Sequence, residues 1–293
     1  MMAKKKSPQE NTMTDSETDN AEVNTPSPGN DTENADGSPD RNQIVSAGNR
    51  KTMNLEAMVK SAREIAEMNE DRYLQATEHD KRKIIYQDMP EGRIANTFRE
   101  IRTKMLALSQ GKNFICMVTS VNSGGGASFV SMNLATAFSF EESKTSIVVD
   151  CNLRHPILDK MVDLEADQGL TDFLEENEIG IERIIYPSGI KRVRLIPVGQ
   201  RRENVVEYFT SVRMKRFLDS LVSRYMDRFI FLDAPPIGDS VDARILAELC
   251  DFVILVVEYG KVTEKKLKTA VDAIGRDRLA GVVFNREPDL FHF

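Results

Sequence analysis

Beyond residue 113, the chain alternates between short apolar runs and segments with helical periodicity. The apolar runs cover residues 114–118, 145–149, 193–197, 229–232, 252–257 and 281–284. Runs with so few polar positions are typical of strands that are buried on both faces of a parallel sheet. Helical patterns lie between the runs, and the first covers residues 127–140. The pattern therefore predicts an α/β fold, with a mostly parallel sheet and helices on both of its faces.

Two further helical patterns precede these runs. In the first, apolar residues recur at intervals of three and four positions, at Leu55, Met58, Val59, Ala62, Ile65 and Ala66. This apolar face belongs either to a helix that binds a partner or to one that packs on its own domain, because periodicity does not identify what covers a face. The charged stretch at residues 79–83 is interpreted as a linker. A second amphipathic helix, predicted over residues 94–108, leads into the first apolar run.

The beginning of the chain has a different composition. It is rich in Ser, Thr, Asn, Asp and Glu and contains Pro8, Pro26, Pro28 and Pro39. Such a segment buries too little apolar surface to offset the entropy lost on ordering. We therefore predict a disordered acidic and polar tail at residues 1–50, an amphipathic helix and linker at 51–84, and one α/β domain at 85–293.

Charge and composition argue against one class of ligand and indicate the cellular compartment. The formal net charge of the 293 residues is −7, which argues against a general nucleic-acid binder because phosphate recognition needs a basic face. No apolar run approaches the about 18 residues that a membrane-spanning helix needs, so we expect a soluble, cytoplasmic protein. Cys116, Cys151 and Cys250 are odd in number and widely spaced, and we interpret them as buried or incidental thiols of a reducing compartment.

A glycine-rich segment follows the first apolar run directly and precedes a helical pattern. In this context, Gly124, Gly125 and Gly126 let backbone N–H groups converge on a phosphate, and the following helix adds its dipole. Against the phosphate-loop pattern G-x-x-x-x-G-K-[ST], Gly126 and Ser128 match, the first glycine is absent, and Ala127 replaces the lysine. The alternative interpretation is that the glycines form only a tight turn between a strand and a helix.

Two of the later runs end in an aspartate. Asp150 closes the run at residues 145–149, and Asp233 closes the run at 229–232. Ligands of open parallel sheets bind at the carboxyl ends of the strands. Asp150 is a candidate base or metal-shell ligand, and Asp233 with Ser128 is a candidate pair of Mg²⁺ ligands. Each aspartate alone would more often cap a helix or form a turn, but the pair downstream of a glycine loop favours a nucleotide site.

These segments resemble the bacterial tyrosine kinases (BY-kinases) that accompany polysaccharide chain-length regulators, a branch of the deviant P-loop ATPases. The family pattern is a GEGKS-type loop, a D-x-D-L-R-x-P loop and a strand that ends in D-x-P-P. The corresponding segments are residues 124–128, 150–156 and 233–236, and the resemblance covers roughly residues 90–286. It implies a P-loop NTPase-like sheet, ATP or ADP with Mg²⁺ as ligands, and a phosphate or subunit contact for Arg154.

The helix before the core matches the family's assembly segment in part. The family pattern there is E-x-x-R-x-x-R, and this chain keeps Arg99 and Arg102 but has Asn96 in place of the acidic residue. The resemblance implies that these arginines contribute to a homo-oligomer, or to a hetero-oligomer with an intact kinase. The alternative is that both arginines lie on the solvated face of an amphipathic helix.

Three departures from the family pattern argue against catalysis. Ala127 removes the phosphate-loop lysine, a loss of preorganised charge that typically costs about 10² to 10³ in rate. Asn152 replaces the second acid of the second loop. The sequence stops at Leu290–Phe293 without the tyrosine cluster in which family members usually end. Together these departures favour a pseudoenzyme.

We therefore predict a component of exopolysaccharide or capsular polysaccharide biosynthesis and chain-length control that resembles a protein-tyrosine autokinase with lost or weakened catalysis. The resemblance places it in the cytoplasm, held at the inner membrane by a membrane chain-length regulator (Wzz-like). One alternative is an active ATP-dependent protein-tyrosine kinase that uses a displaced cation. A second is a positioning ATPase of the septum-site or partitioning type, which is disfavoured because those proteins also need the loop lysine.

Overall fold

The computed structural model describes residues 72–90, 92–200, 205–224 and 227–288, together with Val59, Arg63, Ile65 and Met68. All of these residues belong to one compact unit, residues 49–293. The predicted tail at residues 1–50 lies outside the described residues, and so do the chain end at Leu290–Phe293 and four apolar positions of the first predicted helix, Leu55, Met58, Ala62 and Ala66. Val59, Arg63 and Ile65 are helical, and the role of this helix stays a prediction.

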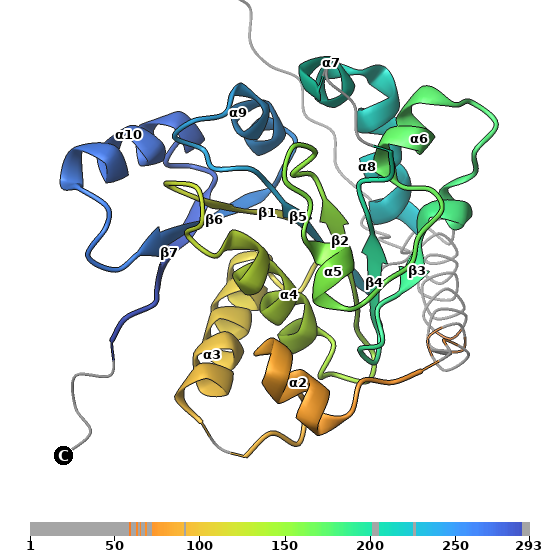
Figure 1. Ribbon diagram of the computed structural model, residues 1–293, viewed down its shortest axis with the longest axis horizontal. Coiled ribbons are helices and arrows are strands. Elements are labelled where there is room, and N and C mark those ends of the chain that lie inside the picture. The colour runs from red at the N-terminus through yellow and green to blue at the C-terminus, as the bar shows by residue number, and fades with distance from the viewer. Residues whose placement is uncertain are drawn as a thin grey trace, which may run out of the picture. The chain divides into compact units, whose positions relative to one another are not determined.

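A seven-stranded sheet forms the centre of the described part of the chain (Figure 1). Its strand order is β3-β4-β2-β5-β1-β6-β7, and only the β3–β4 pair is antiparallel. The strands are β1 (Ile115–Ser120), β2 (Thr145–Asp150), β3 (Tyr186–Pro187), β4 (Val193–Ile196), β5 (Arg228–Asp233), β6 (Phe252–Glu258) and β7 (Leu279–Asn285). The predicted α/β fold class is confirmed. Sequence reasoning missed β3, because two residues are too short for a recognisable pattern.

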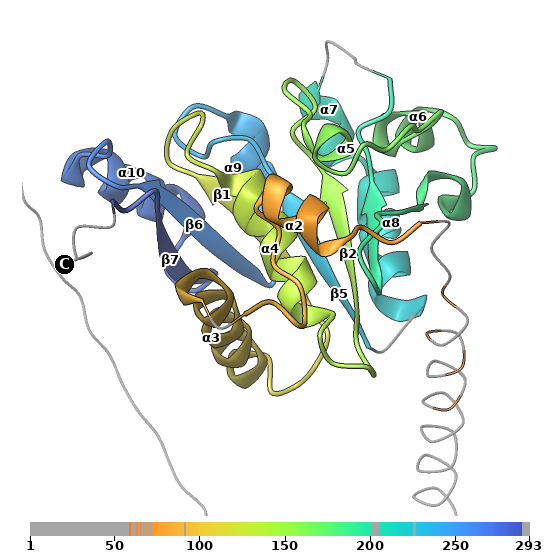
Figure 2. The same cartoon turned by 60° about the horizontal axis from the view of Figure 1, so that its bottom comes forward.

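Helices cover both faces of this sheet (Figure 2). The helices are α2 (Ala76–Arg82), α3 (Arg93–Leu108), α4 (Ala127–Phe138), α5 (Leu158–Met161), α6 (Leu170–Glu175), α7 (Val205–Thr210), α8 (Val212–Arg224), α9 (Val241–Glu248) and α10 (Glu264–Ile274), with a 3₁₀ turn at Ile181–Ile184. Helices α3 and α4 lie on one face, and α8, α9 and α10 lie on the other. Among the described helices, none has the length and apolar character that crossing a membrane requires.

Each face of the sheet has its own hydrophobic core. Alternate residues of β1 point to opposite sides, so that Met117 joins the core under α8, α9 and α10, whereas Cys116 and Val118 join the core under α3 and α4. An aromatic cluster anchors the second core, because the Phe114 ring packs against the rings of Phe138, Phe229, Phe231 and Phe252 at centroid distances of 5.6, 5.0, 6.2 and 5.3 Å. All three cysteines are buried free thiols, as predicted.

The charged stretch that was interpreted as a linker is helix α2 with its C-terminal turn, and that interpretation is wrong. The buried imidazole of His79 packs on the Tyr86 ring, while the charged neighbours face outward. The Asn133 amide of α4 fixes the following turn, since its Oδ1 accepts from the Ile85 N–H at 2.8 Å and its Nδ2 donates to the Lys83 carbonyl at 3.1 Å. A single buried residue among the seven of α2 is too little periodicity to indicate a helix from sequence.

Candidate functional site

The glycine-rich segment connects β1 to α4 at the carboxyl edge of the sheet. Gly124 and Gly126 have positive φ angles of 75° and 94°, and Gly126 is the N-cap of α4. Gly125 lies so close to β1 that an added Cβ would be 2.7 Å from the Ser120 Cβ. Left-handed backbone and close approach both favour glycine. The predicted loop therefore has the strand, turn and helix context of a phosphate loop, with backbone N–H groups at a helix N-terminus.

Two side chains from distant parts of the sequence contact this loop. The Asn285 amide at the end of β7 donates to the Gly125 carbonyl at 2.9 Å, and a Cβ on Gly126 would lie 2.1 Å from Asn285 Nδ2. The Lys266 ammonium of α10 donates to Asn122 Oδ1 at 3.4 Å. Sequence reasoning missed both residues. Asn285 follows the rule that sites lie at carboxyl ends of strands, whereas nothing in the sequence distinguishes Lys266 from the other lysines of its helix.

The first two residues of α4 determine how this loop differs from an ordinary phosphate loop. Ala127 occupies the position of the phosphate-binding lysine, and this residue is only 8% exposed. Ser128 follows Ala127 in the sequence. Its hydroxyl interacts with the Asp233 carboxyl and lowers the pKa of that group, which offsets part of the rise caused by burial. The predicted hydroxyl and acid are thus neighbours across the carboxyl edge, but no cation of α4 stands between them.

The two predicted aspartates are register partners at the ends of β2 and β5. Both side chains are buried, with 1% of each residue exposed. The Asp150 carboxylate accepts three backbone N–H groups, from Asn152 at 3.0 Å and from Ile157 and Leu158 at 3.3 Å. Burial raises the pKa of Asp150 to about 7, although these hydrogen bonds lower it in part. A carboxyl with such a pKa is suited to accept a proton near neutral pH.

Unlike Asp150, Asp233 accepts no backbone N–H group among the described residues. Neither of its carboxylate oxygens has a hydrogen-bond partner of normal geometry. Burial and the neighbouring charge of Asp150 raise the pKa of Asp233 well above its ordinary value, and the Ser128 hydroxyl offsets only part of this. A buried carboxylate without a partner is costly, and a divalent cation would supply the missing charge. The donor set therefore fits Mg²⁺, which is often held by one or two protein oxygens together with phosphate and water.

We expect Asp233→Asn to stabilise the protein in metal-free buffer, because it removes a buried charge while keeping the size of the side chain. The free energy of unfolding at pH 8 should rise by about 1–2 kcal/mol, measured by urea denaturation with a chelator present. Asp239→Asn is the matched control, because Asp239 is exposed and lies in the loop that follows Asp233. It should leave stability unchanged within about 0.5 kcal/mol.

The same experiment has a pH dependence with a defined sign. Because Asp150 holds its proton up to about pH 7 in the folded protein but only to its ordinary value near 3.8 when unfolded, the unfolded chain loses that proton first. Stability should therefore fall as the pH rises from about 4 to about 7. Burial also raises the pKa of Asp233, so Asp233 contributes to the loss of stability with rising pH and Asp233→Asn should reduce it. A variant that is less stable than the wild type at pH 8 contradicts the interpretation.

The second loop runs from Asp150 towards α5 and carries Asn152 and Arg154. Asn152 Oδ1 is buried and has no partner within the described residues. The exposed Arg154 guanidinium lies 3.7 Å from the carboxylate of Asp242, a buried residue in the first turn of α9. Sequence reasoning missed Asp242, although it follows the N-cap Ser240 closely. Arg154 therefore faces α9, and its predicted phosphate or subunit contact stays a prediction.

Arg99 and Arg102 both have partners within the chain. Arg99 Nη1 donates to Asn96 Oδ1 at 3.1 Å, and its guanidinium lies 5.6 Å from the centre of the Phe140 ring. Arg102 Nη1 donates to the Ala137 carbonyl at 2.9 Å, near the C-terminus of α4. Both are half-buried, so neither lies on a simply solvated face. Their role in assembly stays a prediction.

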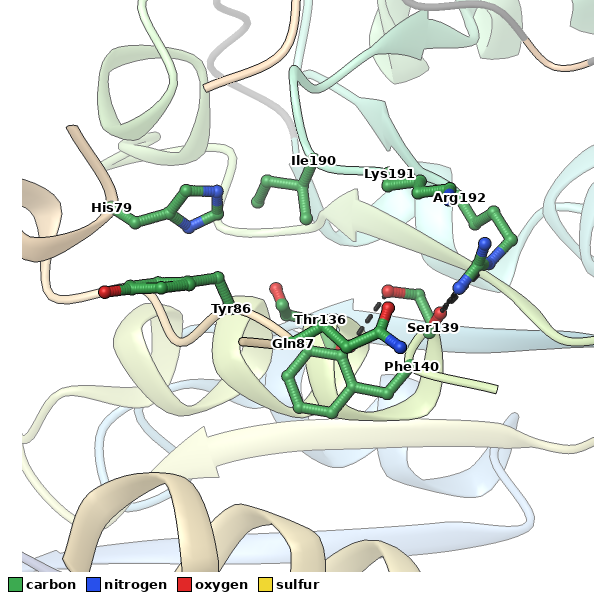
Figure 3. Close-up of a pocket in the computed structure, with 9 residues that line it drawn as sticks. All are labelled: His79, Tyr86, Gln87, Thr136, Ser139, Phe140, Ile190, Lys191 and Arg192. Atoms are coloured by element: carbon green, nitrogen blue, oxygen red, sulfur yellow. Dashed lines mark hydrogen bonds between the residues drawn. The ribbon is translucent and has the colours of Figure 1, made fainter. Parts of the chain in front are cut away.

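A pocket lies away from the phosphate loop, beside α2, the end of α4 and the turn before β4 (Figure 3). It holds about 320 Å³ of space, including open solvent. Arg192 lies in its wall and donates twice to the Ser139 carbonyl, from Nε at 3.0 Å and from Nη2 at 2.6 Å. This contact closes the C-terminus of α4. None of the predicted site residues lines this pocket.

A glycine loop between a central strand and a helix, with acids at the ends of two neighbouring strands, defines an α/β protein of the P-loop type. No family model matches the chain. The chain is 29% identical to tyrosine-protein kinase YwqD of Bacillus subtilis over 208 residues, which is 70% of this chain and 86% of that protein. It is 27% identical to tyrosine-protein kinase CpsD of Streptococcus agalactiae over 192 residues, which is 64% of this chain and 81% of that protein.

The fold agrees with these relatives. The kinase domain of the Escherichia coli tyrosine kinase ETK superposes with a TM-score of 0.64 at 19% identity, over 78% of this chain and 87% of that domain. The chain is therefore similar in sequence to bacterial tyrosine-protein kinases and has the fold of their kinase domains. The resemblance found in the sequence is confirmed.

Proposed function

We propose that this protein is a nucleotide-binding component of a polysaccharide-producing system, with the fold of a tyrosine kinase and weakened phosphoryl transfer. One observation carries the proposal: the loop glycines, Ser128 and Asp233 remain together at the carboxyl edge, while Ala127 occupies the position of the lysine. The parts that bind a nucleotide and its metal are kept. The part that neutralises charge during transfer is missing from α4.

The proposed site assigns a separate role to each group. The backbone N–H groups of Gly124, Gly125 and Gly126 would bind phosphate oxygens, and Ser128 with Asp233 would hold Mg²⁺. When bound, Mg²⁺ neutralises phosphate charge. Asp150, with a pKa of about 7, would accept the proton of an attacking hydroxyl.

The cellular setting is proposed from the family resemblance. The protein would act in exopolysaccharide or capsular polysaccharide biosynthesis and chain-length control, at the cytoplasmic side of the inner membrane. A membrane chain-length regulator would hold it there. Arg99 and Arg102 of α3 would contribute to an oligomer, either of this chain or with an intact kinase. Deletion of the gene should change the amount or length of the polysaccharide, and an unchanged polymer contradicts this setting.

An active tyrosine kinase is the second candidate function. It is favoured by the pKa of Asp150, which suits a base near neutral pH. The two candidates share the nucleotide site and differ only in whether phosphoryl transfer to tyrosine proceeds at a useful rate.

One experiment separates these candidates. The full chain is titrated with Mg·ATP and Mg·ADP by calorimetry and is then incubated with Mg·ATP before phosphotyrosine is measured. We expect micromolar binding, about −8 kcal/mol, without accumulation of phosphotyrosine. Stoichiometric autophosphorylation would establish the active kinase instead. Absence of nucleotide binding by the wild type would overturn the nucleotide-binding function itself, and binding by Ala127→Lys alone would identify the missing lysine as the cause.

A further inference from the structure

We infer that Lys266 of α10 supplies the phosphate-binding cation that the loop lacks at Ala127. The inference rests on the proposed nucleotide site and names a further residue of it. Lys266 Nζ donates to Asn122 Oδ1 at 3.4 Å, across 144 positions of the sequence. The ammonium group therefore lies at the arm of the loop that leads from β1 to the glycines.

Chain geometry keeps this ammonium close to the phosphate-binding backbone. Asn122 and Gly124 are two positions apart in the chain, so their Cα atoms are at most about 7.6 Å apart. The Lys266 side chain is exposed, and its four methylene groups give the ammonium several ångströms of reach. The inference requires that rotation of this side chain bring Nζ from the Asn122 amide to a phosphate bound at Gly124 to Gly126.

The backbone of Lys266 is held in the first turn of α10. Thr263 is the N-cap of α10, and its Oγ1 accepts from the Lys266 N–H at 3.4 Å. Asn285 of the adjacent β7 holds the other arm of the loop through the Gly125 carbonyl, at 2.9 Å. Two side chains from this side of the sheet therefore contact the loop on either side of Gly124. Lys266 therefore contacts the loop together with Asn285, and not as an isolated side chain.

The charge of Lys266 also differs from that of its cationic neighbours. Lys261 and Arg286 both pair with the Glu258 carboxylate at 2.8 Å, and Arg154 pairs with Asp242. Among the described residues, Lys266 has no carboxylate partner, and its side chain contacts the neutral amide of Asn122. Because the group that contacts it is neutral, the positive charge of the Lys266 ammonium is not compensated and can pair with an anion. Hydrogen bonds between charged partners are about twice as strong as neutral ones.

The test is calorimetric titration of the full chain with Mg·ATP and Mg·ADP. Lys266→Ala should weaken Mg·ATP binding about 10-fold or more, whereas Lys266→Arg, which keeps the charge, should weaken it less. Lys265→Ala is the matched control, because it removes an equal charge from the adjacent exposed position. It should change the affinity by less than about 2-fold. Thermal melting of each variant checks that the fold is kept.

A rescue experiment adds a result that a purely structural role would not produce. In the Lys266→Ala background, Ala127→Lys should restore Mg·ATP affinity, because it returns the cation to α4. Equal affinities for Lys266→Ala and Lys265→Ala overturn the inference and leave the nucleotide-binding function standing. Binding by Ala127→Lys alone, without binding by the wild type, overturns both the inference and the nucleotide binding proposed for this chain. If no variant and no wild type binds nucleotide, the proposed function fails together with the inference.

Discussion

Ala127→Lys is expected to raise the rate of phosphoryl transfer to tyrosine by about 10² to 10³, because it restores a preorganised positive charge at the start of α4. The loop already has the required backbone, since Gly124 and Gly126 adopt positive φ angles and Gly126 caps the helix. Ser128 and Asp233 are in place beside it. The substitution thus restores the missing cation to a site that keeps its glycines, Ser128 and Asp233, while Asn152 still replaces the second acid of the family pattern. The measurement is transfer of labelled γ-phosphate from ATP, followed over time.

Ala127→Met is the control for this prediction. Methionine has a long unbranched side chain like lysine but no charge, so that it separates the effect of charge from the effect of size. It should give no increase in transfer. Equal rates for the lysine variant and the wild type would mean that the missing lysine does not limit catalysis, and Asn152 in the second loop would become the residue to test next.

Phe114→Ala is expected to lower the free energy of unfolding by about 3–5 kcal/mol, the usual range for a buried aromatic residue. Phe114 is 2% exposed and packs against four other phenylalanine rings at centroid distances of 5.0 to 6.2 Å. These rings come from α4, β5 and β6, so the cavity would lie where one face of the sheet meets its helices. Urea denaturation followed by circular dichroism measures the change.

Phe284→Ala is the matched control for this second prediction. It removes the same ring from β7, where the side chain is 62% exposed, and it should change stability by no more than about 0.5 kcal/mol. A loss of less than 1 kcal/mol for Phe114→Ala would mean that the aromatic cluster relaxes around the cavity, and it would contradict the rigid packing described above.

Local sequence patterns were sufficient for most of the fold. Continuous apolar runs identified β1, β2, β4, β5, β6 and β7, because strands buried on both faces leave few polar positions. Sequence patterns were insufficient where an element was very short or buried only a single residue. Strand β3 has two residues, and α2 buries only His79 of its seven residues. Neither segment carries the repeated apolar positions that periodicity requires.

The sequence by itself determined the α/β class, the position of the glycine loop between a strand and a helix, and the loss of lysine at Ala127. These features depend on neighbouring residues, and local propensity and spacing are enough to specify them. Only the tertiary structure decided that Asp150 and Asp233 are register partners and that Lys266 and Asn285 contact the loop. The strand order brings these residues together over separations of up to 160 positions, and such long-range pairing follows from the packing of the whole sheet and its helices.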